Sequence, residues 1–151
     1  MDFDGVLNSD AYVRQQNCYG VILNPYKLHL LKRIIFATDA KIVLSTSWRE
    51  HWSPIESKCD NIGHDINRIF RQHGLSIFDK VPQHPLSRED NIRQWLENHP
   101  QISAFVVLDD QFLDAPFLRE HFVKTSNYQG GLDEHDAENA IAILNKEYRH
   151  A

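Results

Sequence analysis

The sequence is poor in cysteine, and its histidines show no spacing that is typical of a metal site. Its two cysteines, Cys18 and Cys59, are far apart and do not form a Cys-x-x-Cys pair. This argues against a disulfide framework and indicates a reducing compartment. The nine histidines lack the His-x-x-x-His spacing of zinc ligands on a helix, so we expect them to be surface or hydrogen-bonded residues.

The sequence also lacks a long apolar run and an excess of positive charge. No stretch approaches the roughly 18 apolar residues of a membrane span, and no signal peptide precedes the first polar motif. The net charge of −5 argues against a general binder of polyanions. We therefore expect one cytoplasmic domain over residues 1–151, with no membrane partner; the sequence leaves the oligomeric state open.

Strands alternate with helices in the apolar pattern of the whole chain. Asn24-Pro25, Asp60 and Ser87 are typical helix starts, and a last helix is expected after Gly131. Short apolar, mostly β-branched runs predict strands at residues 41–45, 77–81, 104–108 and 122–125. This alternation predicts an α/β fold with a mostly parallel sheet.

The first residues carry two carboxylates, Asp2 and Asp4, followed at once by Gly5. If the pair ends a strand, both side chains point the same way, because strand side chains alternate between faces. Two carboxylates held close together cannot both ionise freely, so one can attack while the other exchanges protons. In isolation the same pattern is also typical of a turn.

Polar residues follow two further apolar strands. Residues 45–49, from Ser45 to Arg49, come after one strand, and Asp109-Asp110 follow another. Ligands of open α/β sheets bind beyond the carboxyl ends of the strands, so these groups are expected to converge with Asp2 and Asp4 in one crevice. Four carboxylates favour a hard cation such as Mg²⁺, and the hydroxyls can hold a phosphoryl group. Arg88, in the first turn of a helix, is our candidate for the basic residue.

These clusters together resemble the four motifs of the haloacid dehalogenase (HAD) superfamily, in the right order and over nearly the whole chain. One branch is closer still, the small HAD domains associated with RNA-repair proteins. The residues that carry this resemblance are Asp2-Phe3-Asp4-Gly5-Val6-Leu7-Asn8, Ser45-Thr46-Ser47-Trp48-Arg49, Arg88 with Asn91-Ile92 and Trp95-Leu96, Leu108-Asp109-Asp110, and Gly131-Leu132.

The resemblance implies a fold and a set of roles. The fold is a three-layer Rossmann-like core around a mostly parallel five-stranded sheet, with a minimal cap formed by a flap over roughly residues 7–23. Asp2 would be the nucleophile of a phosphomonoesterase and Asp4 its acid and base. Mg²⁺ would be held by Asp2, the Asp4 backbone carbonyl, and Asp109 or Asp110. Phosphate would be bound by Thr46 (preferred) or Ser47, and by Arg88 with Lys80 in reserve.

The intervals between the motifs leave no room for a large lid domain. Within the superfamily, this suits bulky substrates such as nucleic-acid ends or phosphoproteins. Trp48 and Arg49, beside the phosphate site, are candidates to stack on a base and to pair with a phosphate, although packing also explains Trp48. The expected partner is a phosphorylated substrate, including nucleotides and RNA or DNA ends.

Two other functions fit parts of this pattern. A non-catalytic binding or regulatory module would keep the fold without turnover, since catalytic geometry tolerates little slack and Asp2 has almost no strand before it. A phosphoacceptor receiver domain also gathers aspartates around Mg²⁺, but it has its acidic pair early and a lysine late, which is not the order here.

A strand normally needs about five residues, and only Met1 precedes Asp2. We therefore expect either apolar residues upstream of Met1 or a weakened central strand.

Overall fold

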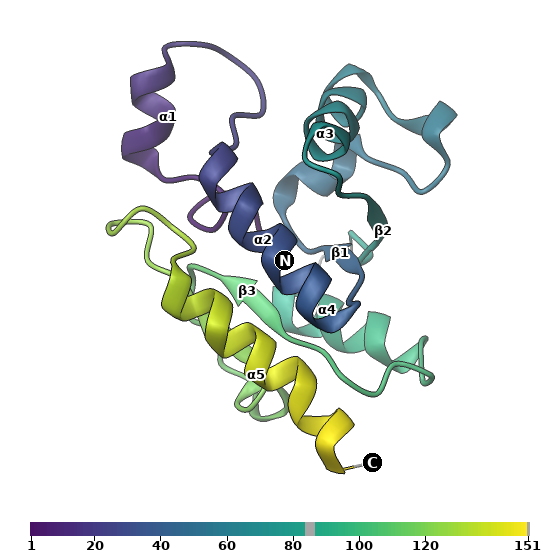
Figure 1. Cartoon of the computed structure of the whole chain (residues 1–151). Helices are drawn as coiled ribbons and strands as arrows, with labels where there is room; N and C mark the ends of the chain where they lie inside the picture. The colour runs from purple at the N-terminus through teal and green to yellow at the C-terminus, as the bar shows by residue number, and fades with distance from the viewer. Residues whose placement is uncertain (84–86, 151) are drawn as a thin grey trace.

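The computed structural model describes residues 1–83 and 87–150, and it alternates helices with short strands as predicted (Figure 1). Most predicted elements are found within a few residues of their expected bounds. The elements are α1 (Asp10–Gln16), α2 (Pro25–Thr38), β1 (Ile42–Leu44), the 3-10 helices η1 (Ser47–His51) and η2 (Glu56–Lys58), α3 (Asn61–Gln72), β2 (Ile77–Lys80), α4 (Arg88–Glu97), β3 (Val107–Asp109), the 3-10 helix η3 (Pro116–Leu118), β4 (Phe122–Lys124) and α5 (Glu134–His150).

The helix starts confirm the capping predictions. The side chains of Asn24, Asp60 and Ser87 accept hydrogen bonds from backbone N–H groups in the first turns of α2, α3 and α4. Helix α1 was not predicted, because none of its residues is buried and it therefore has no apolar stripe to detect. It lies in the expected flap and projects from the body of the molecule (Figure 1).

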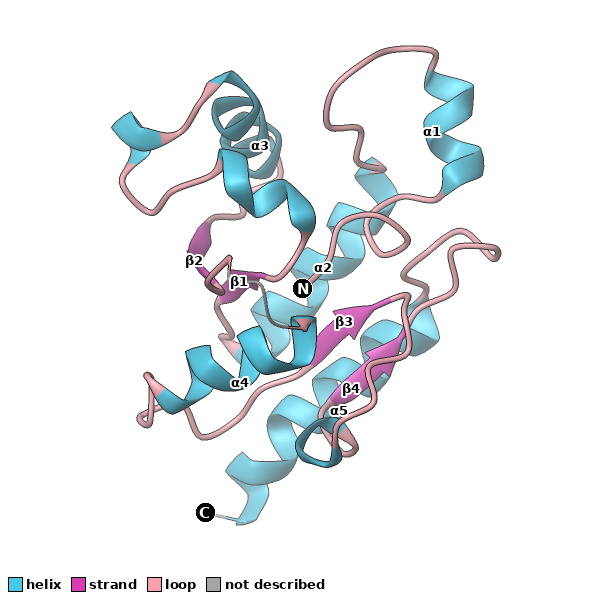
Figure 2. Ribbon diagram, turned by 180° about the vertical axis from the view of Figure 1, so that it is seen from behind, coloured by secondary structure: helices cyan, strands magenta, loops and turns pink. Residues whose placement is uncertain are grey.

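Helices cover both faces of the strands. Helices α2 and α5 pack against each other on one face, and α4 lies on the opposite face (Figures 1 and 2). The larger apolar cluster contains Phe3, Leu28, Leu44 and Phe70, and a second cluster lies around Ile92 and neighbouring side chains of α4 and η3. This is a mixed α/β arrangement in which the strand ends are left free for polar groups.

The predicted five-stranded sheet is wrong for the described residues, which form two separate two-stranded sheets. Strand β1 pairs with β2, and β3 pairs with β4, both in parallel. The strand predicted at 104–108 begins only at Val107. The physical reason is that the segment between the two sheets contributes only Met1 and Asp2, which are too few to form a ladder.

Met1 and Asp2 nevertheless connect the two sheets through backbone hydrogen bonds. The Met1 amino group donates to the Val43 carbonyl (2.8 Å), and the Met1 carbonyl accepts from the Ser45 N–H (2.9 Å). On the other side, the Asp2 N–H donates to the Leu108 carbonyl (3.0 Å). The N-terminus therefore lies at the centre of the molecule (Figures 1 and 2). These hydrogen bonds fix Asp2 between the carboxyl ends of β1 and β3.

An apolar cavity of about 400 Å³ adjoins Met1 between the two sheets. It is lined by side chains of α2, β1, α4 and β3, including Leu31, Val43, Ile92, Trp95 and Leu108. Strand β1 pairs with β2 along one edge and bonds to Met1 along the other. In the same way, β3 pairs with β4 along one edge and bonds to Asp2 along the other. The cavity thus combines an apolar lining with strand edges that are able to pair with a further extended segment.

We predict that a short apolar, β-branched segment added before Met1 stabilises the protein. Burial lowers the pKa of the Met1 amino group to about 6, and an added residue would replace this buried amine by a peptide N–H. Burying even one or two Val or Ile side chains in the cavity should raise the free energy of unfolding by at least about 2 kcal/mol, or roughly 5 °C in Tm. Thermal unfolding monitored by circular dichroism measures this.

A matched extension of Gly and Ser, with equal length, controls for removal of the amine. Equal melting temperatures for the apolar and the Gly/Ser extensions would contradict the prediction.

Candidate active site

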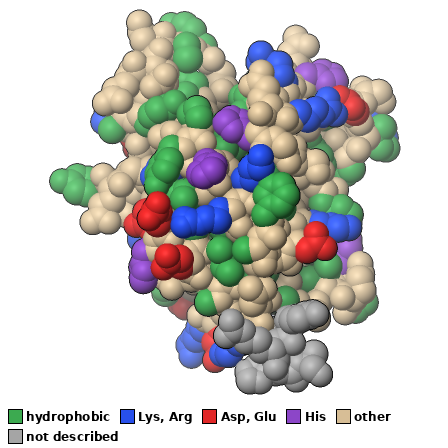
Figure 3. Space-filling model, in the orientation of Figure 1, with side chains coloured by type: hydrophobic (Ala, Val, Ile, Leu, Met, Phe, Trp, Pro, Cys, Tyr) green, Lys and Arg blue, Asp and Glu red, His purple; other side chains and the backbone are tan. Residues whose placement is uncertain are grey.

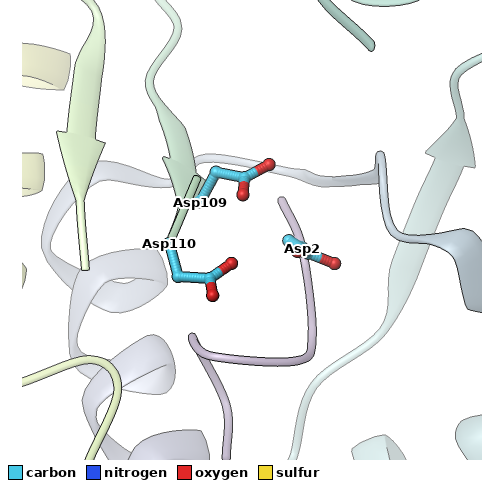
Figure 4. Close-up of side chains that lie close together, drawn as sticks. All are labelled: Asp2, Asp109 and Asp110. Carbon is cyan, nitrogen blue, oxygen red and sulfur yellow. The ribbon is translucent and has the colours of Figure 1, made fainter. Parts of the chain in front are cut away.

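Three carboxylates meet where the N-terminal segment passes the end of β3. Asp109 is the last residue of β3 and is fully buried, Asp110 follows it, and Asp2 is 5% exposed. One oxygen from each of the three lies within 4.8 Å of the others, and Figure 4 shows the side chains together. The N-terminal segment and the end of β3 thus bring these three carboxylates together.

The donor set of this cluster fits a hard divalent cation. All three ligands are carboxylate oxygens, which Mg²⁺ prefers over nitrogen or sulfur. The Asp4 carboxylate does not belong to this cluster. The resemblance implies a different atom of Asp4, its backbone carbonyl oxygen, as a ligand of Mg²⁺.

The guanidinium of Arg88 also reaches this cluster. One of its nitrogens donates to Asp2 (3.1 Å) and to Asp109 (2.7 Å). Arg88 is the first residue of α4, whose start is fixed by the Ser87 cap, so a local capping interaction directs the basic residue to the carboxylates. Among the described residues, this is the cation that the structure brings to Asp2 and Asp109.

Burial and the repulsion between carboxylates raise the pKa values of Asp2 and Asp110, and Arg88 opposes the rise at Asp2. Burial raises the pKa of Asp2; Arg88 opposes the shift, whereas Asp109 adds to it. The pKa of Asp110 is also raised, first by burial and then by the charges of Asp2 and Asp109. Burial lowers the pKa of Arg88, but Asp2 and Asp109 outweigh this effect, so its pKa is raised overall. The site therefore favours additional positive charge.

Gly5 lets the chain turn tightly against the acidic cluster. Its φ of +79° is in the left-handed region, and a Cβ atom at this position would collide with the Asp110 carboxyl group. The Asn8 side chain accepts from the Gly5 N–H (3.0 Å), and the Thr125 hydroxyl donates to the Gly5 carbonyl (2.6 Å). These contacts fix the turn that follows Asp4.

Asp4 is exposed and has partners of its own. Its two carboxylate oxygens accept from the Trp48 indole N–H (3.0 Å) and from the Asn8 amide (3.1 Å). Asp2 and Asp4 therefore lie in different environments: one is buried beside Arg88, and the other is at the surface between two neutral donors.

Thr46 and Ser47 differ sharply in exposure. Thr46 is fully buried, caps η1, and contributes a small lowering of the pKa of Asp2, whereas Ser47 is exposed. The choice between Thr46 and Ser47 as the phosphate-binding residue stays a prediction.

Arg49 and Lys80 are engaged with backbone carbonyls. Arg49 is 8% exposed and donates to the carbonyls of Ser45, Thr46 and Pro82. Lys80 donates to the carbonyls of Arg49 (2.9 Å) and Trp52 (2.5 Å). Both cations hold the loop after β1 and do not contact the acidic cluster.

Sequence reasoning assigned no role to Asn8 or Thr125, which both touch the Gly5 turn. Thr125 follows β4 as the other polar groups follow their strands, so the same signal could have identified it. In the sequence, Asn8 stands only as the last residue of the first motif of the family resemblance, because its contacts depend on the fold of the flap.

None of the helices within the described residues is long and apolar enough to cross a membrane.

Comparison with known proteins gives one family. Residues 1–137 match the family model described as the HAD domain in Swiss Army Knife RNA repair proteins. Neither the curated proteins nor the solved structures gave a match. The family match covers all of the candidate site residues, from Asp2 to Thr125. The chain belongs to the family of HAD domains found in Swiss Army Knife RNA repair proteins.

Proposed function

We propose that this protein is a Mg²⁺-dependent phosphomonoesterase that works through an aspartyl-phosphate at Asp2. The observation that carries the proposal is the cluster of Asp2, Asp109 and Asp110 with the Arg88 guanidinium bonded to two of them. A buried carboxylate next to a cation and beside a site for a hard metal is suited to attack phosphorus. Membership of a HAD family supports a phosphatase-like function.

The proposed reaction uses the two N-terminal aspartates in turn. An Asp2 oxygen attacks phosphorus, and the bond to the leaving oxygen breaks with its electrons staying on that oxygen, which takes the proton of Asp4. Asp4 then takes a proton from water as the water oxygen attacks phosphorus. The bond between phosphorus and Asp2 breaks, which releases inorganic phosphate and restores both side chains.

Asp2, Asp109, Asp110 and the Asp4 backbone carbonyl would hold Mg²⁺, which when bound supplies positive charge to the carboxylates and the phosphoryl oxygens. Thr46, with Ser47 at the exposed edge, would donate to the phosphoryl group. Arg88 would provide a charge-assisted hydrogen bond to it.

The substrate class that fits best is a phosphorylated nucleic-acid end or nucleotide. Trp48 is half-buried at the edge of the site, where its ring could stack on a base, whereas Arg49 is directed to backbone carbonyls. Acidic and basic side chains are interspersed on the face drawn in Figure 3, and the net charge is −5. This favours recognition of a terminal phosphate over binding along a polyanion backbone.

Asp2→Asn should abolish the release of phosphate from p-nitrophenyl phosphate in the presence of Mg²⁺. The amide cannot form the aspartyl-phosphate, so we expect the rate to fall by about 1000-fold or more. A colorimetric assay measures the loss. Asp65→Asn, at an exposed position on α3, is the matched control and should keep full activity. An Asp2→Asn protein with near-normal turnover would refute the proposal.

Mg²⁺ should stabilise the protein through the same carboxylates. At about 100 times the dissociation constant, the expected gain is about 2.7 kcal/mol in the free energy of unfolding, seen as a rise in Tm. Asp109→Asn should remove most of this gain. Arg88→Met should keep the gain, because it leaves the carboxylate ligands in place, and should reduce turnover, because the phosphoryl group loses a charge-assisted hydrogen bond.

A Mg²⁺-dependent rise in Tm that is the same in Asp109→Asn would place the ion elsewhere. Stabilisation by Mg²⁺ without turnover on any phosphoester would favour the non-catalytic binding module instead.

We expect oligonucleotides with a 3′- or 5′-terminal phosphate to be better substrates than small sugar phosphates. Extra contacts at the open edge of the site, such as base stacking worth about 1–3 kcal/mol, should raise kcat/KM by at least about tenfold. Phosphate release from matched oligonucleotides, nucleotides, sugar phosphates and phosphopeptides measures this. Equal kcat/KM values for sugar phosphates and oligonucleotides would contradict the expectation.

A further inference from the structure

Both oxygens of the exposed Asp4 carboxylate are held by neutral donors from separate segments. The Trp48 indole in η1 donates to Oδ2 (3.0 Å), and the Asn8 amide donates to Oδ1 (3.1 Å). An exposed aspartate normally rotates freely between rotamers. Two donors on opposite oxygens fix the orientation of this one.

Asn8 is itself held in place by contacts that use both ends of its amide. It is 3% exposed, its oxygen accepts from the Gly5 N–H (3.0 Å), and its nitrogen also donates to the Ile22 carbonyl (2.8 Å). Ile22 lies at the far end of the flap that contains α1. Asn8 thus links Asp4 to the turn at Gly5 and to the end of the flap.

Trp48 is positioned by the same turn that orders Thr46. Its backbone N–H donates to the Thr46 hydroxyl (3.4 Å) at the start of η1. The loop after β1 is fixed in turn by Arg49 and Lys80, which donate to its backbone carbonyls. The indole N–H is therefore presented from a rigid loop.

We propose that Trp48 and Asn8 are positioning residues that orient Asp4 for transfer of its proton to the leaving oxygen; this rests on the proposed phosphatase function. The indole N–H and the amide NH₂ only donate, so neither can take the proton that Asp4 carries. The acceptor of the Asp4 proton is therefore the leaving oxygen of the substrate. Trp48 and Asn8 hold the Asp4 carboxyl group in the orientation for this transfer.

The consequence is a dependence on the leaving group. A p-nitrophenolate leaves readily without protonation, whereas an alkoxide such as a sugar or nucleoside hydroxyl leaves only with a proton. Loss of the Trp48 hydrogen bond should therefore slow the hydrolysis of alkyl phosphates much more than that of aryl phosphates. A merely structural role of Trp48 would slow both equally.

The experiment compares kcat/KM of Trp48→Phe on p-nitrophenyl phosphate and on glycerol phosphate, because kcat/KM excludes the later hydrolysis of the aspartyl-phosphate, in which Asp4 serves both esters alike. We expect a loss of about tenfold or more on glycerol phosphate and less than about threefold on p-nitrophenyl phosphate. Asp4→Asn should show the same pattern more strongly, and the double variant should be no slower than Asp4→Asn alone. Asn8→Asp, which keeps the acceptor for Gly5 but loses both donor bonds, should follow Trp48→Phe.

Trp95→Phe is the matched control, because Trp95 on α4 also donates to an aspartate, Asp79 (2.9 Å), which does not belong to the acidic cluster. Its ratio of the two rates should equal that of the unaltered protein. Equal losses of Trp48→Phe on the two esters would overturn the positioning role while leaving the phosphatase function intact. An unaltered protein that hydrolyses neither ester would overturn the phosphatase function, and the positioning role with it.

Discussion

The repulsion among Asp2, Asp109 and Asp110 is the constraint on which the rest of the site depends. Three carboxylates with oxygens inside 4.8 Å, two of them buried, raise one another's free energy unless positive charge lies among them. Arg88 supplies such a charge, and the helix that carries it begins at the Ser87 cap so that the guanidinium reaches two of the three. The same repulsion favours a further cation at the site, as the proposed Mg²⁺ would supply.

The backbone holds these carboxylates together with few interactions. Met1 and Asp2 are the only described residues that bond to the inner edges of both β1 and β3, so the nucleophile candidate is also the link between two separate sheets. Gly5 allows the next turn to pass close to Asp110, and Thr125 and Asn8 fix that turn from opposite sides. Fold and site are thus built from the same short segment, which makes the position of Asp2 sensitive to the packing around Met1.

The sequence was most informative where structure is local. Caps at Asn24, Asp60 and Ser87 are recognised from neighbouring residues, and polar groups just beyond apolar strands predicted the convergence of Asp2 with Asp109 and Asp110. Long-range features were less predictable. Helix α1 buries nothing, Arg49 and Lys80 turn toward backbone carbonyls, and residues 104–106 are apolar but begin no strand because β4 starts only at Phe122 after η3. Each depends on contacts that no spacing of residues encodes.

The central claim is that Asp2 forms a covalent bond with phosphorus. Acid quenching during turnover of a phosphate-labelled substrate, followed by proteolysis and mass spectrometry, tests it most directly. The account predicts that the phosphoryl group is recovered on the peptide that contains Asp2 and disappears in Asp2→Asn. Recovery of the label on another residue, or continued turnover by Asp2→Asn with no labelled peptide, would contradict it.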